Sequence, residues 1–190
     1  MLDRGFMDRV ERTASAKLDL RYYMDAAGLR HAFPSHNALY RASSLPSPPR
    51  LPHANQRDLY GVTHLIFHFA DFGAKDMRSL LGAGYEPLRD YVALALAMCL
   101  VQRDWDLAAE LLICRICLNA HGPLDIEAAR ALSEGQDHAG FLPDRTWLRG
   151  LASCDGIERS AQSEFRAVYH PTVVGLFLVA VDMARENGMP

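Results

Sequence analysis

The chain has 190 residues, of which 49% are apolar and 23% charged, and its net charge is -3. This composition is typical of a soluble globular protein long enough to bury a sizeable core. The pI is near 6.2 and the sequence has no run of basic residues, which excludes a nucleic-acid surface built on clustered cations.

The N-terminal segment predicts a helix over residues 3–29. Its apolar residues, Phe6, Val10, Leu18 and Leu20, predict either homodimerisation or packing on the main body. The segment lacks the uninterrupted apolar core of a signal peptide. The longest apolar run, Val173–Val181, is too short to cross a bilayer. Four cysteines without secretory context indicate reduced thiols. We therefore expect a cytoplasmic protein with no membrane contact.

Residues 34–53, PSHNALYRASSLPSPPRLPH, hold five of the ten prolines. A loop this long inside a compact domain is usually functional or disordered. The sequence predicts either a tether or a lid over a pocket here. The predicted organisation is an N-terminal helical segment over 1–33, a proline-rich linker or lid over 34–55, and a helical domain over 56–190.

Helical periodicity dominates from residue 56 onward, and strand patterns are almost absent. Short connections between helices favour antiparallel neighbours. The predicted fold is all-α, a helical bundle or an α/α-barrel-like array. The helices after the linker are expected at 56–72, 75–82, 86–102, 104–120, 125–136, 144–152, 157–169 and 171–187.

The stretch LYGVTHLIFHFADF, residues 59–72, places polar side chains on one face of an otherwise apolar helix. His64, His68 and Asp71 fall within about 60° on a helical wheel, with Tyr60 beside them. A helix that is apolar nearly all round is buried. The polar stripe is therefore expected to face other protein groups or an internal cavity.

Three interpretations of this stripe stay open: a structural network, a metal site, and metal-free acid–base chemistry. Residues 64 and 71 are about 10.5 Å apart along the axis, which strains a single ion held by all three groups. A pair such as His64 and His68 with a ligand from another helix suits a metal better. The cofactor is not determined, although zinc and iron are both suitable. The stretch lacks the glutamate of His-Glu-x-x-His, which excludes a zinc protease.

A second unusual stretch, AVYHPTVVGLFLVAVDM, opens an apolar helix with Tyr169, His170, Pro171 and Thr172. Pro171 suits a first helical turn, which predicts His170 at the cap. His170 is the candidate that completes the site with His64, His68 and Asp71, as a catalytic residue or a metal ligand. Tyr60, Tyr169 and Thr172 are the candidate substrate-binding residues. The alternative for His170 is a capping contact or a solvent-facing ring.

Two further groups of residues are interpreted as structural. Cys114, Cys117 and His121 lack the second cysteine pair of a zinc site and are expected in the core. Asp104 is the expected N-cap of a helix in which Asp106 and Glu110 complement the dipole.

The segments YGVTHLIFHFADFG (60–73), RDWDLAAELL (103–112) and YHPT (169–172) resemble a little-characterised family of bacterial all-helical proteins. The resemblance covers roughly residues 56–185 and implies no particular activity. The antiparallel helical pairs are also similar to α/α-barrel cyclases, which implies a polar site at a barrel mouth.

The predicted function is a small cytosolic enzyme of specialised bacterial metabolism. A buried His/Asp site would carry out proton transfer in cyclisation, isomerisation or elimination, with or without a metal, on a small-molecule or peptide substrate. Histidine chemistry predicts an activity that titrates between about pH 5 and 8. The alternative is a non-catalytic helical module that binds a partner or ligand and whose histidines are structural.

Overall fold

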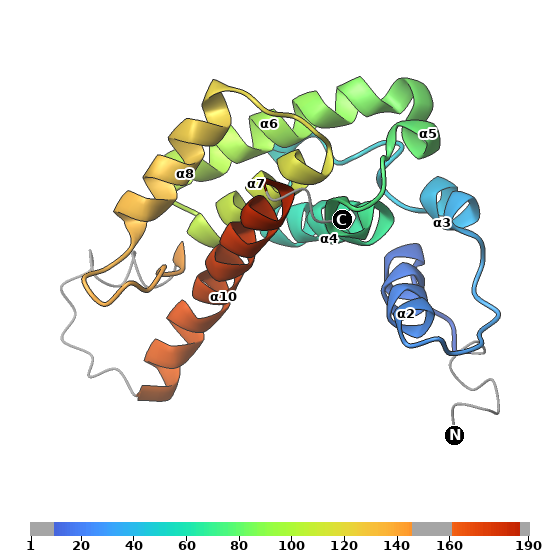
Figure 1. Ribbon diagram of the computed structural model, residues 1–190, viewed down its shortest axis with the longest axis horizontal. Helices are drawn as coiled ribbons and strands as arrows, with labels where there is room; N and C mark the ends of the chain where they lie inside the picture. Colours follow the sequence, from blue (N-terminus) through green and yellow to red (C-terminus); the bar gives the residue numbers. More distant parts are fainter. Residues whose placement is uncertain (1–9, 146–160, 187–190) are drawn as a thin grey trace. The chain divides into compact units, whose positions relative to one another are not determined.

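The computed structural model describes residues 10–145 and 161–186, and every regular element in these ranges is helical (Figure 1). This confirms the predicted all-α class. The chain forms two compact units, residues 1–88 and 89–190. The predicted segments 1–33 and 34–55 both fall in the first unit, and the predicted domain 56–190 contributes to both units.

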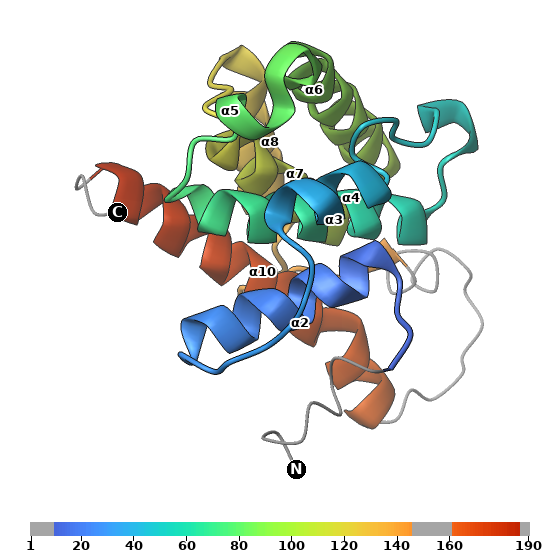
Figure 2. The same cartoon turned by 90° about the vertical axis from the view of Figure 1, so that its right-hand side faces the viewer.

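The described part of the first unit contains four complete α-helices, of which the last is very short, and several 3-10 turns. Its elements are α2 (Ala14–Ala26), α3 (His36–Ala42), η2 (Leu51–His53), α4 (Gln56–Ala70), η3 (Asp71–Gly73), α5 (Arg78–Leu81) and η4 (Gly82–Gly84). Helix α2 packs on both α3 and α4 (Figure 2). Leu18 of α2 is fully buried within the chain. Homodimerisation through this helix stays a prediction.

Local sequence explains where these helices start. Thr13 accepts a hydrogen bond from the Ala16 amide at the start of α2, and Ser35 accepts one from the Ala38 amide at the start of α3. Asn55 and Asp58 form a reciprocal capping box at the start of α4. The proline-rich segment therefore contains a capped helix, α3. Because the segment is rich in proline, the sequence predicted only a tether or lid here. Short side-chain caps, rather than apolar periodicity, define this helix.

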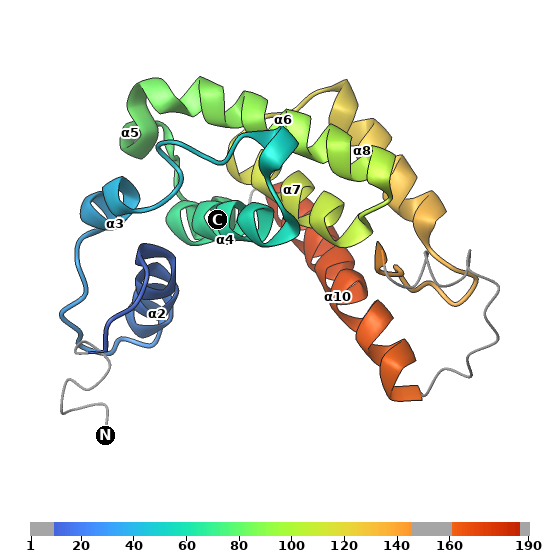
Figure 3. The same ribbon diagram turned by 180° about the vertical axis from the view of Figure 1, so that it is seen from behind.

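The second unit is organised around α7 (Trp105–Cys117), in which all 13 residues are buried. Helices α8 (Pro123–Gly135) and α10 (Ala161–Glu186) both pack on α7 (Figure 3). Helix α6 (Tyr85–Gln102) begins at the end of the first unit and continues into the second. The predicted helix at 144–152 lies largely outside the described residues.

The neighbours of α7 run in opposite directions. Gly135 at the end of α8 approaches Trp105 at the start of α7, so α7 and α8 are antiparallel. His170 of α10 contacts Asp106, and Arg185 contacts His121 just beyond α7. Because these contacts follow the same order along both segments, α10 runs parallel to α7. The expectation that a short connection makes neighbouring helices antiparallel is therefore confirmed for α7 and α8. It does not apply to α7 and α10, which are far apart in the sequence.

Pro171 lies inside α10, not at a helix start, so the two helices expected at 157–169 and 171–187 are one continuous helix over its described residues. Proline has no amide hydrogen, so the carbonyl of Ala167 loses its helical donor. The Asp144 amide donates to this carbonyl at 2.8 Å, and the Leu142 amide donates to Thr172 Oγ1 at 3.1 Å. A tertiary contact thus replaces the missing helical bond and lets the helix continue.

Two glycines offer a matched test of packing. A Cβ at Gly135 would lie 2.9 Å from Cε2 of the buried Trp105 ring, whereas a Cβ at Gly61 in α4 meets nothing within 4 Å. We expect Gly135→Ala to lower the free energy of unfolding by about 1–3 kcal/mol through overpacking. Gly61→Ala should raise it by about 0.5–1 kcal/mol through helix propensity. Urea denaturation measures both, and a Gly135→Ala variant as stable as the wild type would contradict the contact.

Candidate functional site

The strongest convergence of chemical groups lies between α7 and α10. His170 Nδ1 lies 2.8 Å from Asp106 Oδ1 and 2.9 Å from Oδ2. Ligand-type atoms of Asp106, Glu110 and His170 all lie within 4.8 Å of one another. Among residues 10–145 and 161–186, these are the three His, Cys, Asp or Glu side chains close enough together to bind one metal ion.

The helix positions explain how these groups meet. Asp106 and Glu110 are four residues apart on α7, so they lie one turn apart on the same face. Asp104 occupies the N-cap position, as predicted. His170 directly precedes Pro171, where the segment Leu142–Asp144 braces α10 through its two amide hydrogen bonds. These two hydrogen bonds fix the backbone of α10 on either side of His170, whose imidazole contacts α7.

The site is buried on the α7 side and open on the α10 side. Asp106 and Glu110 are 8% and 2% exposed, whereas the His170 side chain is 43% exposed. Two carboxylates in a poorly solvated position repel each other, and a cation between them relieves that repulsion. The arrangement thus combines a buried anionic wall with an imidazole that solvent and solutes can reach.

The cysteines of α7 lie in the core and form no second ligand set among the described residues. Cys114 is one turn beyond Glu110, and burial raises the pKa of its thiol well above 9.0, with Cys117 and Glu110 adding to the effect. Burial also raises the pKa of Cys117 to about 12. These thiols stay protonated and serve as small apolar side chains, as the sequence predicted.

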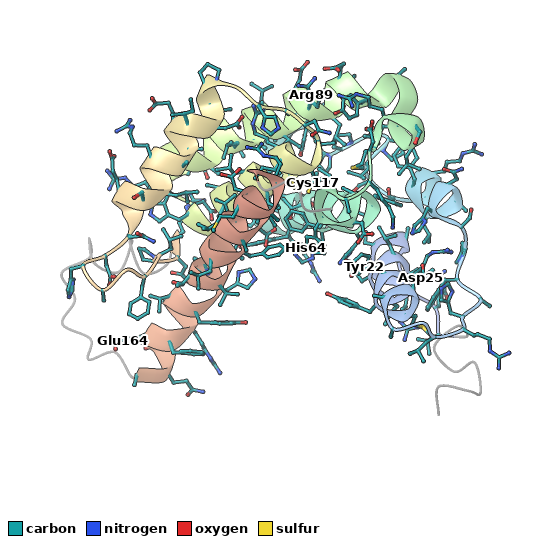
Figure 4. The ribbon with its side chains drawn as sticks, in the orientation of Figure 1. Tyr22, Asp25, His64, Arg89, Cys117 and Glu164 are labelled. Carbon is teal, nitrogen blue, oxygen red and sulfur yellow. The ribbon has the colours of Figure 1, made fainter. Side chains whose placement is uncertain are left out.

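In the first unit, His68 joins α4 to α2. The ring is buried, and its Nδ1 lies 2.9 Å from Asp19 Oδ1, at ion-pair distance but not aligned as a hydrogen bond. The ring centroids of His68 and Tyr22 are 4.9 Å apart. Asp19 and Tyr22 are three residues apart on α2 and so share a face of this helix, on which Figure 4 labels Tyr22. These contacts hold the two helices together.

Asp71 does not continue the polar stripe of α4. The helix ends at Ala70, and Asp71 adopts a left-handed conformation with φ of 50°. The helical wheel therefore misplaced its side chain. Tyr22 donates to Asp71 Oδ1 at 3.0 Å, and Lys75 Nζ lies 2.9 Å from Oδ2. The Lys75 hydrogen bond holds the pKa of Asp71 below its ordinary value, and burial with the Asp71 carboxylate raises the pKa of Tyr22 to about 12.

The remaining predicted residues are partly exposed. His64 lies on the exposed side of α4, so the predicted stripe is not buried throughout. Tyr60 contacts the His64 ring edge-on, with centroids 6.4 Å apart. Tyr169 is 46% exposed and stacks on Phe165 at 5.1 Å. The catalytic or metal-binding roles of His64, His68 and Asp71, and the substrate-binding roles of Tyr60, Tyr169 and Thr172, stay predictions.

Sequence reasoning missed Asp106 and Glu110 as site residues. Carboxylates in a first helical turn have an ordinary explanation in the helix dipole. The pattern that distinguishes them is their place in RDWDLAAELLICRIC, where the residues directly before and after each of the two carboxylates are apolar and the whole helix is buried. A carboxylate at such a position needs a polar or cationic neighbour, and the parallel α10 supplies His170.

Residues 1–180 match a family described as a domain of unknown function, DUF6895. The chain belongs to this family. The match is consistent with the predicted little-characterised family, while the bacterial origin and the motifs quoted for the resemblance stay predictions. No curated protein and no solved structure matches the chain. The function of this DUF6895 member is therefore inferred from the geometry of its own side chains.

One helix in the described part of the chain, Ala161–Arg185, is long and apolar enough to cross a membrane by length and composition, and little of it is buried. The longest apolar run in the sequence, the nine residues Val173–Val181, underestimates the length of this helix, which Pro171 does not interrupt. Core helices of soluble proteins that meet the same criterion are mostly buried, whereas 11% of this window is buried. The polar contacts of His170 and Arg185 connect α10 to α7 and to His121. The cytoplasmic location stays a prediction.

The Asp71 contacts predict a pH-dependent contribution to stability. Because its pKa is depressed in the folded state, the contribution is present above the ordinary pKa of 3.8 and is lost as pH falls through the folded value. Asp71→Asn keeps a residue that tolerates the left-handed conformation but removes the charge. At pH 7 we expect a loss of about 0.5–1 kcal/mol, since the Asp71 side chain is 34% exposed and solvent screens the pair.

Urea denaturation of wild type and Asp71→Asn from pH 7 down to about pH 3 measures this difference, which should shrink as the pH falls. Asp90→Asn, which removes an exposed carboxylate on α6, is the control and should leave stability unchanged at both ends. A gap between wild type and Asp71→Asn that stays constant with pH would contradict the ion pair.

Proposed function

We propose that the chain binds a divalent cation at Asp106, Glu110 and His170 and uses it for proton-transfer or hydrolytic chemistry on a small-molecule or peptide substrate. The observation that supports this most strongly is the convergence of two buried carboxylates and one accessible imidazole within 4.8 Å. The groups come from two helices whose register is fixed independently by the Arg185–His121 contact further along.

The ligand set restricts the cation. Two carboxylate oxygens and one imidazole nitrogen suit zinc, iron(II) or manganese(II), while soft copper(I) prefers sulfur. Three protein ligands leave coordination positions for water or substrate, as in catalytic metal sites. A water bound to such a cation loses a proton near neutral pH, which provides a base or nucleophile without a further protein group.

The accessible side of the site suits this chemistry. The His170 ring is reached from solvent, whereas Asp106 and Glu110 hold the opposite side in a poorly solvated environment. Without a cation, the same Asp106 carboxylate would orient the imidazole of His170 for acid–base catalysis. Cyclisation, isomerisation, elimination and hydrolysis all include a proton transfer to or from the substrate, and the His170 imidazole is the group that would carry it out.

The alternative proposal is a non-catalytic helical module. The His68–Asp19 and Tyr22–Asp71 contacts support it for the first unit, since both join α2 to α4. Separate alanine substitutions at His64, Asp71 and His170 distinguish the two proposals. Unfolding of these variants favours a structural role, whereas folded variants that lose a measured activity favour a catalytic one.

Cation binding is tested by isothermal titration with Zn²⁺ and with Mn²⁺ on the full chain. Glu110→Gln preserves the shape of the side chain and removes its charge. We expect Glu110→Gln and His170→Asn each to lower the affinity by about tenfold or more, because each removes one of three ligands. Circular dichroism checks that both variants fold.

Asp25→Asn is the matched control, because Asp25 Oδ1 also lies 2.8 Å from an imidazole nitrogen, that of His31, on the exposed surface of the first unit. This variant should bind the cation as the wild type does. A wild type that binds neither ion, or an Asp25→Asn variant that loses as much affinity as Glu110→Gln, would refute the site.

Protons compete with the cation for an imidazole ligand, so the affinity for Zn²⁺ should fall as pH is lowered from 8 to 5. In His170→Asn this pH dependence should become weaker, because one ligand for which protons compete with the cation is gone. Titrations at several pH values measure the slope. Equal slopes in the two proteins would show that His170 is not a ligand.

A further inference from the structure

A second feature of the second unit is a cavity of about 700 Å³ between α8 and α10, with α7 as its floor. Helices α8 and α10 both pack on α7, and the groove lies between them. Leu112 and Ile116 form the floor. Apolar side chains line both walls: Ile126, Ala129 and Leu132 from α8, and Leu176, Val179 and Met183 from α10.

We propose that this groove binds an elongated, mainly apolar small molecule that carries one anionic head group, with the head beside Arg185. Asp106, Glu110 and His170 do not line the groove. The proposal therefore stands apart from the cation site and adds a ligand class to the protein.

The dimensions of the groove limit its occupant. From Thr172 to Arg185 the lining follows α10 for 13 residues, or about 20 Å at the helical rise. A volume of about 700 Å³ spread over that length describes a long, narrow space. Its shape suits an elongated molecule that lies along α10.

The rims of the groove leave large apolar side chains in solvent. Ile126 on α8 is 72% exposed, and Leu176 and Val179 on α10 are 67% and 55% exposed. An apolar ligand along the groove would remove part of this surface from water on both sides at once. Cavities of about 300–1,000 Å³ with apolar walls and a few polar groups are typical of small-molecule sites.

Polar groups gather at one end of the groove, where α7 and α10 end and α8 begins. Arg115 forms a bidentate pair with Asp125, which also accepts a hydrogen bond from the Gly122 amide at 2.7 Å. Arg185 Nη2 lies 3.0 Å from Asp182 Oδ1. Each carboxylate at this end thus already faces an arginine.

Arg185 is the group best placed to take an anionic head. Its Nη1 lies 2.7 Å from His121 Nδ1 and 2.9 Å from Nε2, and its side chain is 40% exposed. Partial burial and the Arg185 charge lower the pKa of His121, so the ring is neutral at pH 7 and accepts from the guanidinium. A guanidinium carries five N–H donors, more than these two neighbours use. Held in this position, it can pair with a carboxylate or phosphate.

The test compares three probes of equal chain length, dodecanoate, dodecanol and dodecylammonium, by titration of the full chain. The two charged probes are kept below their micellar concentrations, and dodecanol below its solubility limit. We expect dodecanoate to bind most tightly. Arg185→Gln should weaken dodecanoate binding by about tenfold or more and leave dodecanol unchanged, because only the charged head loses a partner.

A second pair of variants tests the groove itself. Ala129→Phe adds a ring to an exposed position on the α8 wall and should abolish binding of dodecanoate and dodecanol. Ala180→Phe adds the same ring to an exposed position of α10 that does not line the groove, and should bind as the wild type does. Glu110→Gln should also bind dodecanoate normally, so failure of the cation site and failure of the groove are distinguishable.

Three results would overturn the proposal. The first is no dodecanoate binding by the wild type. The second is equal binding by Ala129→Phe and the wild type, which would place the chain on the exposed apolar surface of α10. The third is equal or tighter binding of dodecylammonium, which would contradict an anionic head at Arg185.

Discussion

The second unit depends on the complete burial of α7. A helix buried on every face has no solvent to satisfy its polar side chains, so each polar group on it must meet a neighbouring element. Asp106 meets His170 of α10, and Arg115 meets Asp125 of α8. These two polar contacts, on opposite ends of α7, set the directions and registers of the two helices that cover it.

The register of α10 has a consequence for both proposed sites. Two contacts, His170 with Asp106 and Arg185 with His121, make α10 parallel to α7, while α8 runs antiparallel. One side of α10 brings an imidazole to two carboxylates, and another side forms a wall of the groove. A single long helix thereby takes part in a proposed cation site and a proposed ligand groove without sharing residues between them.

Pro171 is compatible with this arrangement only because of a contact made far away in the chain. Without the Asp144 amide, the carbonyl of Ala167 would lie inside the helix without a donor, at a cost comparable to a lost hydrogen bond. The same short segment contacts Thr172 through the Leu142 amide. The two hydrogen bonds that support α10 around Pro171 therefore also fix the position of His170.

The sequence by itself determined the all-α class, the helix around His64 and His68, the N-cap at Asp104 and the burial of Cys114 and Cys117, because these follow from local periodicity and capping. It also singled out His170, whose ring lies beside Asp106 in the structure. Only the tertiary structure decided that Asp71 leaves α4 in a left-handed conformation, since Tyr22 and Lys75 hold it there. Only the tertiary structure made Pro171 an interior residue and paired His170 with Asp106. Periodicity reports which face of a helix is buried, but the identity of its neighbour depends on contacts between segments 64 residues apart.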